Sequence, residues 1–337
     1  MMPEPVHPLT ARLAAWGKRL ILLYRSFRPV HAEIKGICQG EKSVRRIHYI
    51  GEGETLPFLK KIIFSDIREE TIKRCSLFHC LNGGPASGKF REPVIVEINR
   101  LFSPWIRSDW RFPPWIRQIA RFHDSDALSL RIRKNDGTYG RRVRQYGYKM
   151  DISRDAKDLR DFYVRFYRPY IRACYPDMAY VRSPFELCRP GISGFLLRVI
   201  DKENAVAGVV VRKTGKTVTT LAFGLLPEYK ARLRQGALSS AYFFLLAWAR
   251  KNKILTLDFR RSRPHTRDGL YEHKRRWGAQ PFPDPWPHTM LHIHVSTHAI
   301  LPENMHNLLV LKSGRLVRLA DVLKNADDTG LSQELNA

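Results

Sequence analysis

Residues 241–278 read AYFFLLAWARKNKILTLDFRRSRPHTRDGLYEHKRRWG, and the order of structural signals in this stretch decides the fold. Its start belongs to an apolar pattern with helical spacing, which predicts a helix over 236–251. The apolar run 254–259 is typical of a buried strand. A second helix is predicted from Thr266 or Asp268 to Arg276, because an acidic residue opens it, basic residues close it and Gly278 suits the position after its end.

The remainder of the second half reads as short strands around one further helix. Three apolar runs separated by turn residues predict an antiparallel meander over 194–226. Asn135-Asp136-Gly137 is a turn signal between two strand-like runs. The predicted elements are strands at 128–133, 141–149, 194–200, 205–212, 217–226, 254–259 and 289–295, and helices at 155–173, 236–251 and 266–276.

The first half is predicted to be a separate, strand-rich domain. Its expected elements are strands at 33–38, 45–50, 72–81 and 93–100 and a helix at 56–64. Trp105, Trp110 and Trp115 then recur every five residues among prolines, a spacing that fits neither a helix face nor a strand face. We therefore interpret 101–125 as a linker. The expected domains are 29–125 and 126–300, followed by a tail at 301–337.

Composition restricts the partners and the compartment. The chain has 337 residues, a hydrophobic fraction of 44% and a net charge of +26, so it folds around a core and suits polyanionic partners. Five cysteines without a C-x-x-C pair indicate a reducing cytoplasm. Residues 1–28 predict a basic amphipathic helix, which either packs on the domain or contacts the inner membrane peripherally through residues 9–28.

Two local motifs suggest functions that the surrounding sequence does not support. GGPASGKF at 83–90 lacks the Ser or Thr that a P-loop places after its lysine, so we expect an ordinary loop. His292 and His294 share one face of the last strand, but no carboxylate or cysteine nearby completes a metal site. We expect structural histidines and no metal.

Residues 258–278 contain the candidate chemistry. Asp258 ends a buried strand, where clefts form in α/β folds. Arg261 and Arg263 are candidate anion clamps, and His265 is a candidate general base. In the alternative interpretation the charges form a solvated helix face, and Tyr271 and Trp277 are core residues.

These residues carry a resemblance to the GNAT acyltransferase fold. The order of elements from about 128 to 295 resembles that fold, whose second half forms an acyl-donor cleft from strand, turn, helix, strand, helix, strand. LYEHKRRWGAQ at 270–280 is similar to the GNAT helix whose tyrosine protonates the leaving thiolate, and Tyr271 matches that tyrosine. The resemblance implies a mixed, mainly antiparallel sheet flanked by helices.

Part of the pattern also resembles the Fem-type aminoacyltransferases, which carry two GNAT-like domains in tandem. Lys274-x-x-Trp277-Gly278 is similar to their motif, in which a lysine contacts substrate phosphates. The GNAT phosphate-binding turn corresponds to Arg232-Leu-Arg-Gln-Gly-Ala-Leu, so Arg232, Arg234 and Gly236 are expected at the donor phosphates. The spacing of this turn differs from that of GNAT enzymes, which leaves acyl-CoA, acyl-carrier protein and aminoacyl-tRNA open as donors.

The resulting expectation is an N-acyltransferase without a permanently bound cofactor. Its acceptor is expected to be an amine on a small molecule, sugar or lipid precursor. Backbone amides in the strand 219–225 would polarise the carbonyl, and Asp258 or His265 would take the proton of the amine. Asp268 and Trp277 are expected near the substrate. The alternative is a non-enzymatic basic protein that binds nucleic acid or associates with a membrane.

Overall fold

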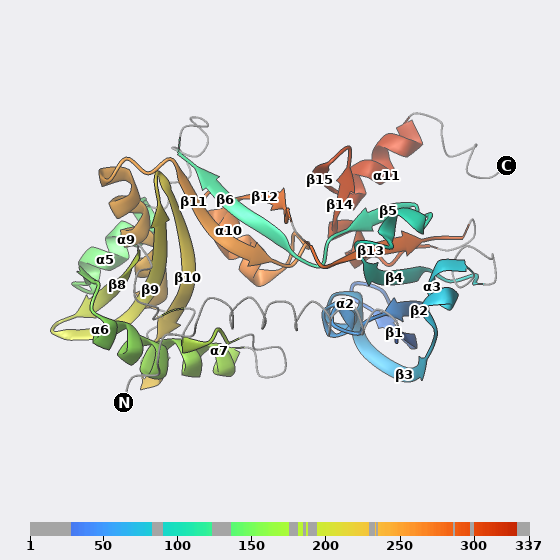
Figure 1. Ribbon diagram of the computed structural model, residues 1–337, viewed down its shortest axis with the longest axis horizontal. Coiled ribbons are helices and arrows are strands. Elements are labelled where there is room, and N and C mark those ends of the chain that lie inside the picture. The colour runs from blue at the N-terminus through green and yellow to red at the C-terminus, as the bar shows by residue number, and fades with distance from the viewer. Residues whose placement is uncertain are drawn as a thin grey trace, which may run out of the picture. The chain divides into compact units, whose positions relative to one another are not determined.

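The computed structural model describes residues 28–82, 90–122, 136–174, 181–184, 187, 194–228, 233, 235–285, 287–296 and 300–328 (Figure 1). Several predictions fall outside these residues, namely the helix before residue 28, the P-loop-like stretch 83–89, the strand 128–133, and both Arg232 and Arg234. The chain divides into two compact units. Unit 1 comprises the described residues of Met1–Ile116, Arg263–Asp268 and Pro283–Ala337. Unit 2 comprises those of Arg117–Ser262 and Gly269–Phe282.

Unit 1 contains a six-stranded sheet in the order β3-β1-β2-β4-β13-β5. Every neighbouring pair is antiparallel except β2 and β4, which run parallel. The strands are β1 (Val30–Cys38), β2 (Val44–Gly51), β3 (Phe64–Arg74), β4 (Val94–Asn99), β13 (Thr289–His294) and β5 (Trp110–Phe112). A small second sheet pairs β14 (Leu309–Lys312) with β15 (Arg315–Arg318).

The apolar side chains of unit 1 form cores on both faces of the six-stranded sheet. The larger core joins the sheet to α2 (Leu56–Ile63), η5 (Glu303–Asn307), β14 and α11 (Leu319–Asp328). The helix α2 buries Leu56, Phe58, Leu59, Ile62 and Ile63, which recur at helical spacing. The smaller core involves β4 together with α3 (Leu77–Asn82) and residues near η1 (Ser103–Trp105).

Unit 2 contains a seven-stranded sheet in the order β12-β6-β11-β10-β9-β8-β7. Its strands are β6 (Ile116–Arg121), β7 (Lys149–Ser153), β8 (Gly194–Asp201), β9 (Asn204–Thr214), β10 (Thr217–Leu225), β11 (Thr256–Ser262) and β12 (Gln280–Pro283). From β7 to β10 the neighbours are antiparallel, whereas β10 and β11 run parallel. Its helical elements are η2 (Asp136–Gly140), α5 (Arg141–Gln145), α6 (Ala156–Asp161), η3 (Phe162–Tyr167), α7 (Arg168–Cys174), α9 (Ala237–Lys251) and α10 (Gly269–Arg276).

The two faces of the unit 2 sheet carry different helices. Val211, Val218 and Leu257 belong to the core that contains α9. Val210 and Leu221 belong to the core that contains η3, which continues into α7. Because successive side chains of a strand point to opposite faces, the burial pattern separates an α9 face from an α7 face.

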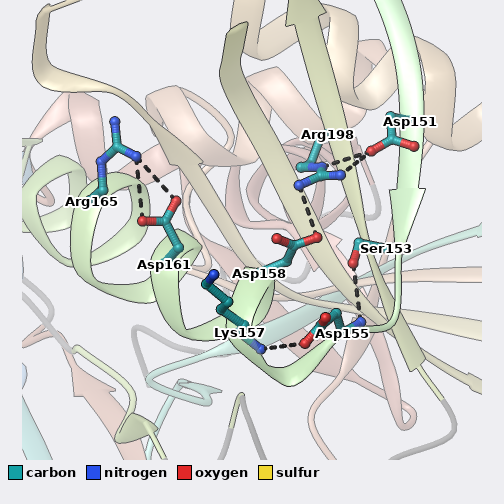
Figure 2. Close-up of polar contacts among 8 residues, drawn as sticks. All are labelled: Asp151, Ser153, Asp155, Lys157, Asp158, Asp161, Arg165 and Arg198. Atoms are coloured by element: carbon teal, nitrogen blue, oxygen red, sulfur yellow. Dashed lines mark hydrogen bonds and ion pairs between the residues drawn. The ribbon is translucent and has the colours of Figure 1, made fainter.

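Ion pairs join β7 and β8 to α6 at the edge of this sheet (Figure 2). Arg198 on β8 donates to Asp151 on β7 and pairs with Asp158 on α6, at 2.9 Å between Nη1 and Oδ2. Asp155 caps α6 by accepting from the backbone N–H of Lys157 at 2.7 Å. The edge strand and the helix that follows it are therefore held together by charge.

The structure confirms the mixed fold with two mainly antiparallel sheets, and it corrects several predicted segments. The strand expected at 72–81 is instead the end of β3 followed by α3, and the strand expected at 141–149 begins as α5. The expected linker 101–125 contributes β5 to unit 1 and β6 to unit 2.

The expected domain boundaries change as well, because strand pairing joins distant parts of the sequence. The strand expected to end the second domain is β13, which pairs with β4 and β5 in unit 1. The expected tail 301–337 contains β14, β15 and α11, and Leu301, Met305 and Leu319 are buried in the unit 1 core. Within the described residues, no helix is long and apolar enough to cross a membrane.

Candidate functional site

The strands β10 and β11 of unit 2 pair for three residues and then separate. Thr217, Val218 and Thr219 pair with Thr256, Leu257 and Asp258, and the described ladder ends there. On its other side β10 shifts register against β9 between Thr220 and Ala222, which places a bulge at Leu221. A bulge leaves a backbone group outside the ladder and redirects it. The end of the β10–β11 ladder and the bulge therefore lie within two residues of each other on β10.

The helix α9 begins after β10 with a glycine in the left-handed region. Gly236 has φ of 88°, and its carbonyl accepts from the N–H of Ser240 at 2.8 Å. A Cβ on Gly236 would lie 3.2 Å from Cδ of Arg142. The first turn of this helix contains no acidic residue. The partial positive charge of the helix start and the adjacent arginine suit an anionic group.

Asp258 is held by two donors in the row where β10 and β11 last pair. Its side chain is only 2% exposed. The guanidinium of Arg117 on β6 donates to Oδ2, and the backbone N–H of Arg260 donates to Oδ1 at 2.8 Å. These contacts support a positioning role more directly than the expected role as a general base.

Arg260 has a strained backbone and a guanidinium surrounded by like charges. Its φ is 63°, a left-handed value that residues other than glycine rarely adopt. Burial lowers the pKa of Arg260, and the nearby guanidinium groups of Arg182, Arg261 and Arg212 lower it further. Of the described residues that act on Arg260, the Asp258 carboxylate raises its pKa.

The helix α10 is fixed to β11 and β6 by buried hydrogen bonds. The ammonium of Lys274 donates to the backbone oxygen of Arg261 at 2.7 Å and to the hydroxyl of Ser262 at 3.1 Å. That hydroxyl donates to Gln118 Oε1 at 2.6 Å, and Gln118 Nε2 donates to the backbone oxygen of Tyr271 at 3.0 Å. Tyr271 is 4% exposed and Lys274 is 5% exposed. The contacts of Lys274 show a positioning role, whereas phosphate binding by this residue stays a prediction.

The aromatic residue expected at the substrate lies in the core. Trp277 is 1% exposed and stacks on Tyr242 with ring centroids 5.5 Å apart and planes inclined by 10°. Tyr139 packs at 4.6 Å, and Trp277 Nε1 donates to His273 Nε2 at 3.3 Å. The structure therefore supports the core interpretation of Trp277. Burial lowers the pKa of His273 to about 4, and the nearby Arg276 and Lys274 act in the same direction.

Arg263, His265 and Asp268 are predicted site residues that belong to unit 1, because the segment Arg263–Asp268 is part of that unit. The Arg263 guanidinium lies 3.8 Å from the ring centroid of Trp115 and 4.8 Å from that of Phe58, and burial lowers its pKa to about 10. His265 is 2% exposed, and its Nε2 lies 3.0 Å from the backbone oxygen of Asn304. The described structure gives its buried Nδ1 no hydrogen-bond partner, and burial lowers its pKa.

The structure therefore separates residues that the sequence placed in one cluster. Asp258, Arg261, Tyr271 and Lys274 share unit 2, whereas Arg263, His265 and Asp268 share unit 1. The backbone N–H of Asp268 donates to the oxygen of His265 at 3.0 Å, as in a local turn. The proposed base role of His265 has no support from these contacts.

Sequence reasoning also missed residues that contribute to the site from other elements. Arg117 and Gln118 come from β6, a strand hidden inside the expected linker. Arg212 pairs with Thr219, which pairs with Asp258, so the three form one row across the sheet. Burial alternates along β6, with Ile116, Gln118 and Ala120 buried, but its residues IRQIAR do not alternate between apolar and polar, so the sequence carried no strand signal here.

No described group of three or more His, Cys, Asp or Glu side chains is arranged to hold a metal ion. His292 instead lies within hydrogen-bond distance of two serine hydroxyls, Ser103 at 2.8 Å and Ser108 at 2.9 Å. Burial lowers its pKa to about 4. These contacts support the expected structural role of this histidine.

No model of a known protein family matches the chain, and no curated protein matches it. Similar solved structures include L-PGS from Bacillus licheniformis, with a TM-score of 0.36, 10% identity, and coverage of 77% of this chain and 83% of that chain. FemX has a TM-score of 0.39 and 12% identity over 75% of this chain and 82% of its own. A GCN5-related N-acetyltransferase from Kribbella flavida has a TM-score of 0.30 and 14% identity over 59% of this chain and 67% of its own. At these identities and TM-scores the similarities carry no inference about donor or acceptor.

Proposed function

We propose that the protein is an N-acyltransferase of the GNAT type and that unit 2 binds the acyl donor. The observation that carries this proposal is the separation of β10 and β11 beside a bulge at Leu221, followed by α9. The elements β10, α9, β11, α10 and β12 occur in the order expected for a GNAT acyl-donor cleft. That order is a property of this chain and does not depend on the solved structures.

In the proposed mechanism the donor carbonyl lies against the backbone of β10. The N–H groups near Leu221 polarise the carbonyl oxygen as it gains negative charge. The phosphates of the donor lie at the start of α9, near Gly236 and Arg142, where the helix dipole favours anions. Arg232 and Arg234 belong to the same proposed phosphate site by their positions in the sequence.

The proton transfers are assigned to residues on α10 and to water. The amine attacks the carbonyl carbon, its proton leaves to water, and the tetrahedral intermediate expels the thiolate or alkoxide of the donor. Tyr271 protonates that leaving group. Asp258 holds Arg117 and the backbone of Arg260, so we assign it to positioning. The acyl or aminoacyl group passes directly to an amine of a small molecule, sugar or lipid precursor.

Thermal unfolding with separate donors tests the proposal and identifies the donor class. Acetyl-CoA, a long-chain acyl-CoA, acyl-carrier protein and aminoacyl-tRNA are added one at a time to the full chain. A donor at about 100 times its Kd stabilises the folded protein by about 2.7 kcal/mol. A shift with one donor that Gly236→Ala reduces supports the proposal. No shift with any donor, together with a salt-sensitive shift on arbitrary nucleic acid, would instead support the nucleic-acid-binding alternative.

A further inference from the structure

We propose that Arg260, Arg212 and Arg261 form a phosphate-binding site on the α7 face of unit 2, and that the acceptor carries this phosphate. The inference rests on the proposed transferase function. It adds the chemical class of the acceptor, which is a phosphorylated amine or an amine on a phosphate-bearing lipid or sugar. The three arginines are distinct from the residues expected to hold the donor phosphates.

Strand register places this site. Arg212, Thr219 and Asp258 form one row across β9, β10 and β11. The adjacent row of Lys213, Val218 and Leu257 contributes Val218 and Leu257 to the core under α9. Since neighbouring rows face opposite sides of a sheet, Arg212 and Asp258 face away from α9. Arg182 adds a fourth guanidinium from the segment after α7, and its backbone N–H donates to the hydroxyl of Tyr167 at 3.0 Å.

Among the described residues, three guanidinium groups and one carboxylate act on the charge of Arg260. That carboxylate is Asp258, whose two oxygens already accept from Arg117 and from the Arg260 backbone. The described structure gives neither Arg260 nor Arg212 a side-chain hydrogen bond or ion pair. Arg260 is partly buried, whereas Arg212 and Arg261 are exposed beside it. Guanidinium groups that repel one another are stabilised by a shared anion, and phosphate matches their paired donors.

The backbone of Arg260 points to the same conclusion. A left-handed φ of 63° costs free energy for any residue with a Cβ, and glycine would adopt it without strain. An arginine at this position is explained if its guanidinium binds a ligand. Strained backbone of this kind is concentrated at functional sites.

The position along β10 assigns the phosphate to the acceptor. Arg260 follows Asp258 by two residues, which corresponds to the level of the bulge at Leu221, where the proposed mechanism places the reacting carbonyl. The donor phosphates are proposed beyond the end of β10 at Leu225, roughly 13 Å further along the strand at its usual rise per residue. A phosphate beside Arg260 therefore belongs to the other reactant.

Arg260→Gly tests the site because the substitution removes the guanidinium and relieves the backbone strain. The full chain is titrated with pyrophosphate and with inorganic phosphate at constant ionic strength, and binding and Tm are measured. We expect Arg260→Gly to have a higher Tm than wild type without anion. We expect it to bind pyrophosphate about tenfold more weakly or worse, so that the order of the two Tm values reverses at high pyrophosphate. Arg212→Gln is expected to weaken binding similarly.

Lys202→Gly is the matched control. Lys202 is also a cation at positive φ, 56°, but it lies in the turn between β8 and β9, at the opposite end of β9 from Arg212. This variant should gain Tm without losing pyrophosphate affinity. Sedimentation with phosphatidylcholine vesicles, with and without phosphatidic acid, distinguishes a lipid phosphate from a soluble one. Binding that depends on Arg260, either to soluble pyrophosphate or to the phosphatidic acid vesicles, supports the site and shows whether the phosphate is soluble or lipid-bound.

Two results would overturn the inference. One is the absence of binding in both the anion titration and the vesicle sedimentation. The other is binding that Arg260→Gly leaves unchanged. The donor titration keeps the two proposals separate. Pyrophosphate binding that depends on Arg260, without any donor shift, would remove the transferase function and with it the assignment to an acceptor. A donor shift without such phosphate binding would remove only this inference.

Discussion

Ser262→Ala removes the hydroxyl that joins α10, β11 and β6. The Ser262 side chain is fully buried, at 0% exposure. Its hydroxyl donates to Gln118 Oε1 at 2.6 Å and accepts from the Lys274 ammonium at 3.1 Å. A neutral hydrogen bond contributes about 1 kcal/mol and one to a charged group about 2 kcal/mol, so the expected loss of stability is about 3 kcal/mol. Since one oxygen atom is deleted, the cavity left behind adds little.

Urea unfolding followed by far-UV circular dichroism measures this loss. The midpoint should fall with an unchanged slope, and Tm should fall by roughly 6–12 °C for a unit of this size. Ser65→Ala is the control, because the Ser65 hydroxyl donates to the oxygen of Ile37 at 3.1 Å in an exposed position and should change stability by less than about 0.5 kcal/mol. Combined with Lys274→Met, Ser262→Ala should show coupling of about 1.5 kcal/mol or more. A loss below about 1 kcal/mol for Ser262→Ala would refute the network.

Four further predictions address the site and the buried groups. Tyr271→Phe should lower kcat about 10²–10⁴-fold with little change in KM, measured in steady-state transfer assays; an unchanged kcat would exclude the acid role. Gly236→Ala should lower the free energy of unfolding by about 1–2 kcal/mol and weaken donor binding, because φ of 88° is left-handed and strains a residue with a Cβ. Thermal unfolding measures this loss, and a variant as stable as wild type would refute the left-handed conformation at residue 236. Burial chiefly lowers the pKa of His273 and of His292 from 6.5 to about 4, so the unfolded chain takes up these protons first. Stability is therefore retained above pH 6.5 and lost as the pH falls from 6.5 to 4, by about 3 kcal/mol for each histidine in acid titrations, and either His→Gln variant should reduce that loss. Burial chiefly raises the pKa of Cys38 to about 11, so a thiol reagent at neutral pH should label it only on unfolding, and rapid labelling of the native protein would contradict its burial.

The sequence by itself determined the meander β8–β10, the helices α9 and α10 and the strand β11 of unit 2, and their order. The apolar spacing of 236–251 and the run 254–259 predicted α9 and β11, because burial of one face imposes its period on the sequence. Turn residues marked the meander of β8, β9 and β10 for the same kind of local reason. Trp277 shows the limit of the local pattern, because we expected it near the substrate and the structure places it in the core, which was the alternative interpretation.

The tertiary structure decided which of these elements share a sheet and a site. Hydrogen bonding between strands depends on partners distant in the chain, so β13 pairs with β4 in unit 1 although it follows unit 2 in sequence. The turn at 263–268 looked continuous with its neighbours, yet it places His265 in unit 1 and leaves Asp258 and Tyr271 in unit 2. The residues around Arg260 are set by strand register and by its left-handed backbone. Neither can be predicted from the sequence of residues 258–278, because register depends on strands that are distant in the chain.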